Sequence, residues 1–171
     1  MKDKDATWWS VLKAAIELDI KRDHLKWRMS DLSRASGVSR SLIYYYFGRD
    51  RSAILSEAIR LFGEPLSGIA KNHMDLWDRK AYAEALYEAK LILDRIPQIL
   101  IFYFLHRNAD SEIGELIRSF EKKGIQKRKK FFPSLDDKGA RALFALQMGI
   151  CVGPLKTLDE MRKAVEMIKI K

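Results

Sequence analysis

Apolar residues recur along most of the chain at the three- and four-residue spacing that places them on one face of a helix. The first such stripe, expected within a helix over about residues 6–21, consists of Val11 or Leu12 with Ala15, Ile16 and Leu18. Another, over residues 52–62, consists of Ile54, Leu55, Ala58, Ile59 and Phe62. Only 9 Gly and 4 Pro interrupt the 171 residues, and long helix-forming segments lie between them. The pattern predicts an all-α fold.

More helices are expected in the second half of the chain. Gly63, Glu64 and Pro65 should end the 52–62 helix and mark a domain boundary. The helices expected beyond it cover about residues 66–77, 80–95, 98–107, 111–131, 136–152 and 158–170. The segment 98–107 is apolar on nearly every side, so it is expected to be buried at the centre of the second domain.

The stretch from Met29 to Arg51 has a different pattern, that of two short helices joined by a tight turn. Gly37 supplies the positive φ that such a turn or a helix C-cap needs. Val38 is the apolar residue between the helices, and Ser39 can accept a hydrogen bond from the start of the next helix. The second helix, about residues 40–47, places Ile43 on a face that its polar residues avoid. This pattern predicts a helix-turn-helix whose second helix enters a DNA major groove.

A specific resemblance supports this interpretation. The run Ser36-Gly37-Val38-Ser39-Arg40, followed by Leu42-Ile43-Tyr44-Tyr45-Tyr46-Phe47, resembles the DNA-binding signature of the tetracycline-repressor (TetR) family of bacterial regulators. The resemblance extends to both flanking helices and covers roughly the first third of the chain. The sequence departs from the family's usual residues at Ser41, at Leu42 and at Trp27-Arg28. An extra residue after Phe47 moves the family's basic position to Arg51, with Arg49 as the alternative.

The expected DNA contacts follow from this arrangement. The start of the second helix points into the groove, where a bidentate arginine such as Arg40 can pair with guanine. Tyrosines further along can reach phosphates or thymine methyl groups. The candidate DNA-binding residues are Arg28, Ser39, Arg40, Ser41, Tyr44, Tyr45, Tyr46 and Arg51. Trp27 has two open interpretations, packing against the sugar-phosphate edge or closing the three-helix core.

The resemblance implies that the chain is divided into three parts. These are a three-helix DNA-binding domain over residues 1–50, a connecting helix over 51–63 and a helical ligand-binding and dimerisation domain over 64–171. It also implies a homodimer that binds palindromic operator DNA, with the last two helices forming a four-helix bundle with a second copy. The candidate interface residues are Leu143, Leu146, Ile150, Val165 and Ile168, for which internal packing is the alternative.

A ligand site is expected in the second domain. Aromatic residues crowd its sequence, and His106 offers a polar anchor for a small apolar or aromatic effector. The candidate ligand-binding residues are Trp77, Tyr87, Phe102, Tyr103 and His106, for which core packing is the alternative. An alternative function is a DNA-binding adaptor that binds a partner protein and no metabolite. Its docking surface would be the basic run 122–130, which is otherwise expected to be a solvated helix face.

The positive charge of the chain favours a nucleic-acid partner. The formal net charge is +9, and residues 24–51 contain six Lys or Arg against two Asp, a net of +4 around the proposed reading helix. Phosphate neutralisation would be needed there.

The sequence offers no catalytic motif. The three histidines lie far apart, and there is no Cys pair, glycine-rich phosphate loop or GxSxG motif, so we expect neither enzyme activity nor a metal or other cofactor. Cys151 lies in an apolar run and is expected to be a buried thiol rather than a redox sensor. The longest apolar run, residues 99–105, is far below the roughly 20 residues that span a bilayer. Residues 1–10 mix charges and lack a continuous apolar stretch of signal-peptide length, so no signal peptide is expected. A cytoplasmic protein is expected.

Overall fold

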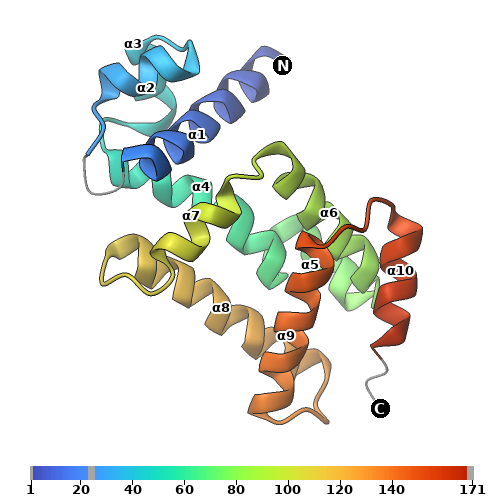
Figure 1. Cartoon of the computed structure of the whole chain (residues 1–171). Coiled ribbons are helices and arrows are strands. Elements are labelled where there is room, and N and C mark those ends of the chain that lie inside the picture. Colours follow the sequence, from blue (N-terminus) through green and yellow to red (C-terminus); the bar gives the residue numbers. More distant parts are fainter. Residues whose placement is uncertain (1, 23–25, 169–171) are drawn as a thin grey trace. The chain divides into compact units, whose positions relative to one another are not determined.

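The computed structural model describes residues 2–22 and 26–168, and these residues form ten α-helices and no strand (Figure 1). The predicted all-α fold is therefore confirmed. The helices are α1 (Lys2–Arg22), α2 (Met29–Ser36), α3 (Arg40–Phe47), α4 (Arg51–Ser67), α5 (Lys71–Asp78), α6 (Tyr82–Arg95), α7 (Ile99–His106), α8 (Glu112–Phe131), α9 (Asp137–Val152) and α10 (Leu158–Met167). None of the described helices is both long enough and apolar enough to cross a membrane.

The described chain divides into two compact units. Unit 1 comprises the chain up to Arg60 together with Ile96–Ile117, and unit 2 comprises Leu61–Arg95 and the chain from Arg118 onward. Helices α4 and α8 thus contribute residues to both units. The sequence analysis placed residues 96–117 within the domain 64–171, whereas the structure groups them with the N-terminal helices.

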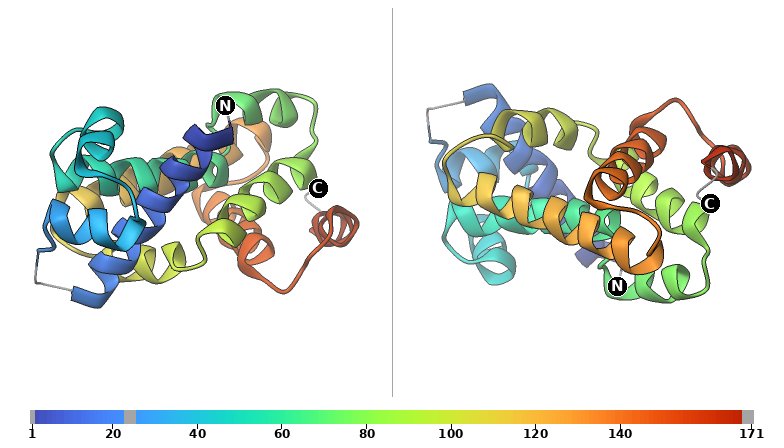
Figure 2. Two further views of the ribbon diagram at one scale, coloured as in Figure 1. Left: turned by 90° about the horizontal axis from the view of Figure 1, so that it is seen from above. Right: turned by 90° about the horizontal axis from the view of Figure 1, so that it is seen from below.

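Unit 1 is organised around α1, which packs against α2 and α7. Figure 2 shows α1 beside α2 in both views. The predicted stripe of α1 is buried through Val11, Leu12, Ala15 and Ile16. The helix begins at Lys2, earlier than the apolar pattern indicated.

The prediction that the apolar segment 98–107 is buried on most sides was wrong. In α7, Ile99, Phe102 and Tyr103 are buried, but Ile101, Phe104 and Leu105 are 53%, 68% and 54% exposed. Within unit 1 this helix is covered on the side that packs on α1. Apolar composition alone does not determine how many of its sides are covered.

The prediction that Gly63, Glu64 and Pro65 end the connecting helix was also wrong, because α4 continues to Ser67 with Pro65 inside it. Pro65 removes one helical N–H, but the rest of the last turn is still helical. The helix instead ends at Gly68, where φ is +72° and a Cβ atom would meet the Trp77 indole at 2.5 Å. Both the positive φ and the lack of room for a Cβ atom require glycine at this position.

Unit 2 is organised around α6, which packs against α5, α9 and α10. Its core-facing residues include Ala83, Leu86, Ala89 and Leu93. The start of α9 is capped by Asp136, whose carboxylate accepts from Gly139 N at 2.7 Å.

The predicted burial of Cys151 is confirmed, since none of its surface is exposed. Its thiol lies 3.5 Å from the Leu86 carbonyl oxygen, to which it donates. Burial raises the pKa of the Cys151 thiol to about 12, so the group stays protonated at neutral pH.

Candidate nucleic-acid interface

The turn between α2 and α3 is built by one glycine and two serines. Gly37 has φ +70°, as predicted, and no atom lies within 4 Å of where its Cβ would stand, so conformation rather than space requires glycine there. The Ser36 hydroxyl donates to the Leu32 carbonyl oxygen at 2.7 Å. The Ser33 hydroxyl donates to the Val38 carbonyl oxygen, also at 2.7 Å. These bonds fix the direction in which α3 leaves the turn.

Helix α3 has a capped start and a buried inner face. Ser39 is the N-cap, and its hydroxyl accepts from Leu42 N at 3.4 Å, which confirms the predicted cap. Ile43 is completely buried, as is Leu32 on α2. The ring of Phe47 stacks on Trp8 of α1 with centroids 6.1 Å apart.

The outer face of α3 carries most of the predicted DNA-binding residues. Ser39, Arg40 and Ser41 are exposed, and Tyr45 is 79% exposed. Tyr44 and Tyr46 are half-buried. The Arg49 guanidinium lies 5.3 Å from the centroid of the Tyr44 ring. The structure thus brings six of the eight candidates together on one short helix and its cap.

Arg28 lies just before α2, outside that helix. Its side chain is exposed, and its backbone N–H donates to the Asp31 carboxylate at 2.9 Å. The neighbouring Trp27 is 3% exposed, so of its two interpretations the structure supports core packing.

The eighth candidate, Arg51, is engaged inside unit 1. Its guanidinium forms an ion pair with Asp19 and lies 5.4 Å from the centroid of the Trp27 ring. Its side chain is only 27% exposed. The exposed basic residue after α3 is Arg49, which the sequence analysis kept as the alternative.

Asp19 is the centre of a polar cluster that the sequence analysis missed. Its carboxylate is 1% exposed and accepts from three side chains of other segments. They are the Trp27 indole (3.1 Å), the Arg51 guanidinium and the His106 ring (2.9 Å). Burial raises the pKa of Asp19, but the His106 hydrogen bond and then the Arg51 charge lower it more, so the net pKa lies below its usual value. The available signal was that Asp19 follows Ala15 and Ile16 at the three- and four-residue spacing of the apolar stripe of α1.

The predicted ligand-binding residues are divided between the units. Trp77 and Tyr87 belong to unit 2, whereas Phe102, Tyr103 and His106 belong to α7 in unit 1. Trp77, Phe102 and Tyr103 are buried. His106, the expected polar anchor for a ligand, is hydrogen-bonded to Asp19. These residues therefore have structural partners of their own.

The basic run 122–130 is not simply a solvated face, because Arg128 is completely buried. Its guanidinium donates to the carbonyl oxygens of Leu66 (3.1 Å) and Ser67 (3.2 Å), the last residues of α4, and so caps that helix. It also donates to Gln147 Oε1 at 2.8 Å. The Trp77 and Phe144 ring centroids lie 5.0 and 4.8 Å from it. Desolvation by burial lowers the pKa of Arg128 to about 9.

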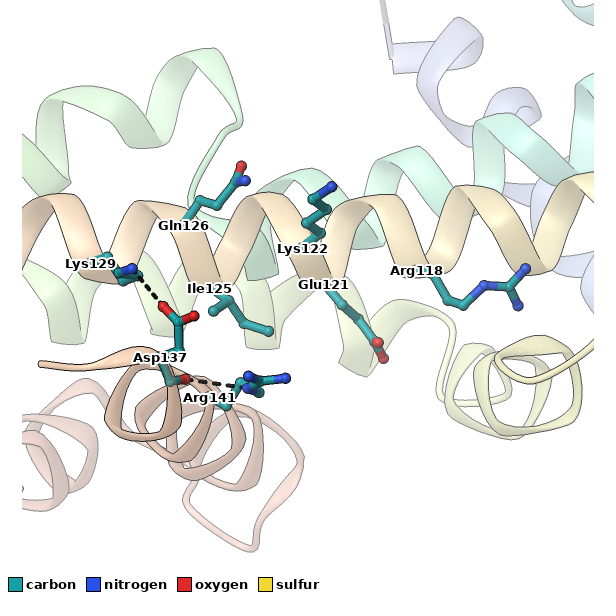
Figure 3. Close-up of a pocket in the computed structure, with 8 residues that line it drawn as sticks. All are labelled: Arg118, Glu121, Lys122, Ile125, Gln126, Lys129, Asp137 and Arg141. Carbon is teal, nitrogen blue, oxygen red and sulfur yellow. Dashed lines mark hydrogen bonds and ion pairs between the residues drawn. The ribbon is translucent and has the colours of Figure 1, made fainter.

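A second part of the basic run faces α9. Figure 3 shows Lys129 and Arg141 converging on Asp137. Lys129 Nζ lies 2.5 Å from the Asp137 carboxylate, and its hydrogen bond and charge lower the pKa of that group. Arg118 and Lys122 also line the open groove here, which measures about 530 Å³. All but one of its lining residues are polar or charged, and the cations outnumber the carboxylates.

The predicted dimer-interface residues fall into two sets. Leu143, Val165 and Ile168 line a small pocket of about 160 Å³ inside unit 2. Ile150 is half-buried, whereas Leu146 is 54% exposed. Leu146 belongs to an exposed stripe along α9, the α9 stripe, whose members are Ala142, Ala145, Leu146, Gly149 and Val152.

Within the described part of the chain, no group of three or more His, Cys, Asp or Glu side chains is arranged to hold a metal ion. Comparisons with models of known protein families, with curated proteins and with solved structures found no match.

Proposed function

We propose that the protein is a dimeric, sequence-specific DNA-binding regulator of transcription, similar to TetR-type repressors, with α3 as its recognition helix. The observation that carries the proposal is the outer face of α3. Arg40, Ser41 and the 79%-exposed Tyr45 project from a short helix whose inner face is buried. An exposed arginine beside exposed hydroxyl groups matches the chemistry of base edges and phosphates.

The charge around α3 supports the same proposal. Five basic side chains of this region are exposed, namely Lys26, Arg28, Arg34, Arg40 and Arg49. Of the two nearby acids, Asp50 is already hydrogen-bonded to Ser52 and Asp31 to the backbone of Arg28. The five exposed cations outnumber these two acids, of which only Asp50 is exposed, and this excess of positive charge favours a polyanionic partner.

DNA binding can be tested with Arg40→Ala, using DNA from the promoter region of the protein's own gene at two salt concentrations. We expect loss of one bidentate base contact, about 1–3 kcal/mol, or roughly 5- to 150-fold in specific affinity. Fluorescence anisotropy with a specific and a scrambled duplex would measure the loss. Arg141→Ala, which removes an exposed arginine from unit 2, is the charge-matched control and should retain the affinity. Equal binding by wild type and Arg40→Ala would refute a reading role for α3.

Dimerisation is proposed to use the α9 stripe. Its small residues allow close helix approach, and no atom lies within 4 Å of where a Gly149 Cβ would stand. Ala145→Arg should therefore give a monomer in sedimentation that keeps the helical circular dichroism spectrum of the wild type. Ala53→Arg, at another exposed alanine, is the matched control and should remain dimeric. A wild type that is monomeric at tens of micromolar, or an Ala145→Arg dimer, would contradict this interface.

The second candidate function is an adaptor whose unit 2 binds an acidic partner protein and no metabolite. The observation that favours it is the polar groove at Arg118, Lys122 and Arg141. A partner that co-purifies with wild type and is lost from Lys122→Glu, without thermal stabilisation by any small ligand, would favour this function.

A further inference from the structure

An open pocket of about 310 Å³ lies in unit 2 beside the residues that follow α4. Three apolar and three charged side chains define its chemistry. They are Ile69, Met74 and Phe131, with Lys127, Lys130 and Asp78. None of these six residues was a predicted ligand-binding residue, although Phe131 packs against the predicted Trp77.

The apolar wall combines a fixed ring with an adaptable side chain. The Phe131 ring is held against the buried Trp77, with centroids 5.4 Å apart. Met74 is 48% exposed, and a methionine can adjust its shape to a bound molecule. Ile69 is half-buried and adds a branched apolar surface. A pocket of this volume, at the low end for ligand sites, suits one or two rings or a short alkyl chain.

Two ammonium groups flank the same ring. Lys127 Nζ lies 5.4 Å from the Phe131 centroid and Lys130 Nζ lies 5.9 Å from it. Lys127 also donates to the Gly68 carbonyl oxygen. Desolvation lowers the pKa of Lys127, although the charge of Asp78 opposes that change. With one carboxylate and two cations, the pocket has room for one more negative charge.

We propose that this pocket binds a small amphiphilic monoanion, an aromatic or alkyl body that carries one carboxylate. The carboxylate lies between Lys127 and Lys130, and the body lies on Phe131, Ile69 and Met74. A neutral apolar molecule would add no negative charge to balance the second lysine, and a bare inorganic anion would leave the apolar wall exposed to water.

Ligand binding in this pocket would affect the end of α4 through Lys127. The incoming carboxylate competes with the Gly68 carbonyl oxygen for the same ammonium group, so binding changes the hydrogen bonding directly after α4. The first part of α4, from Arg51 to Arg60, belongs to unit 1, which contains the proposed recognition helix. This regulatory consequence rests on the proposed function, whereas ligand binding itself does not.

The test uses the full chain without DNA and 2-naphthoate as the probe, with isothermal titration calorimetry as the measurement. We expect saturable binding of one naphthoate per chain. Lys130→Gln should weaken it about ten-fold or more, as expected for the loss of one charge-assisted hydrogen bond. Met74→Asp should weaken it as strongly by placing a like charge on the apolar wall. Lys122→Gln, the same charge change on another part of α8, should bind as wild type does.

Several outcomes would overturn the proposal. One is the absence of saturable binding up to millimolar naphthoate, and another is equal weakening by Lys130→Gln and Lys122→Gln. Binding of 2-naphthalenemethanol as tightly as naphthoate would show that the charge is irrelevant. If acetate bound to the protein as tightly as naphthoate does, the apolar wall would be irrelevant to binding.

A second experiment separates this site from the proposed function. The affinity of wild type and Lys130→Gln for operator DNA is compared with and without saturating naphthoate. A change in wild type that is absent in Lys130→Gln supports coupling through α4, and an unchanged wild-type affinity overturns that coupling. A wild type that binds naphthoate but no DNA would refute the proposed function and leave the ligand site supported.

Discussion

Replacing Arg128 with alanine is expected to lower the free energy of unfolding by about 3–5 kcal/mol. The guanidinium is completely buried and donates to the Leu66 and Ser67 carbonyl oxygens and to Gln147 Oε1. Its removal leaves these acceptors buried without a donor, each costing about 1–3 kcal/mol when no water replaces it. It also leaves a cavity where the guanidinium packed between two aromatic rings. This loss is a large fraction of the roughly 5–15 kcal/mol by which a domain is usually stable.

Urea unfolding followed by circular dichroism would measure this loss. Lys129→Ala is the matched control, because Lys129 is the next residue of α8 and its ion pair with Asp137 is on the surface. Such pairs contribute about 0–1 kcal/mol. Arg128→Lys should recover only part of the stability, since one ammonium group replaces a guanidinium that spans several acceptors. An Arg128→Ala loss no larger than that of Lys129→Ala would show that the buried guanidinium does not stabilise the fold.

Replacing Asp19 with asparagine is expected to destabilise the protein by about 2–4 kcal/mol at neutral pH and to flatten its acid dependence. The folded-state pKa of Asp19 lies below its usual value of 3.8. The ionised carboxylate therefore contributes stability that is present above about pH 4 and is lost as pH falls through the folded pKa. At neutral pH, asparagine leaves the partly buried Arg51 charge without its partner.

The difference in unfolding free energy between wild type and Asp19→Asn, measured by urea titration at pH 7, 5, 4 and 3, tests this expectation. It should be largest at pH 7 and 5 and should shrink below pH 4, where the wild-type carboxylate becomes protonated. Asp159→Asn is the control, because Asp159 forms an exposed helix pair with Lys163 and should cost less than about 1 kcal/mol. A wild-type advantage that is the same at pH 7 and pH 3 would mean that the charge of Asp19 does not stabilise the cluster.

The sequence by itself determined the features that depend on a few neighbouring residues. The helical periodicity predicted an all-α chain, and the structure is all-helical in its described part. The positive φ of Gly37 and the cap at Ser39 were predicted correctly. These features are local, since a backbone conformation or a cap involves only residues within the same turn of chain.

The proline rule was applied too strictly to Pro65. Interior prolines break helices because they remove an N–H bond and clash with the preceding turn. In α4 the last turn is helical in spite of Pro65, and its residues Leu66 and Ser67 are buried. The location of the helix end was decided by Gly68 and Trp77, which meet only in the folded chain.

Only the tertiary structure decided which charged and apolar side chains are buried. Arg128 is one of several basic residues in its run, yet it alone of the described 122–130 side chains is fully buried, because its acceptors lie more than 60 residues away on α4. Asp19 finds His106 at a separation of 87 residues. Conversely, Phe104 lies in the most apolar helix and is 68% exposed, since burial requires a partner surface and not only an apolar side chain. The apolar periodicity indicates which segments are helical, whereas long-range contacts determine which side chains of those helices are buried.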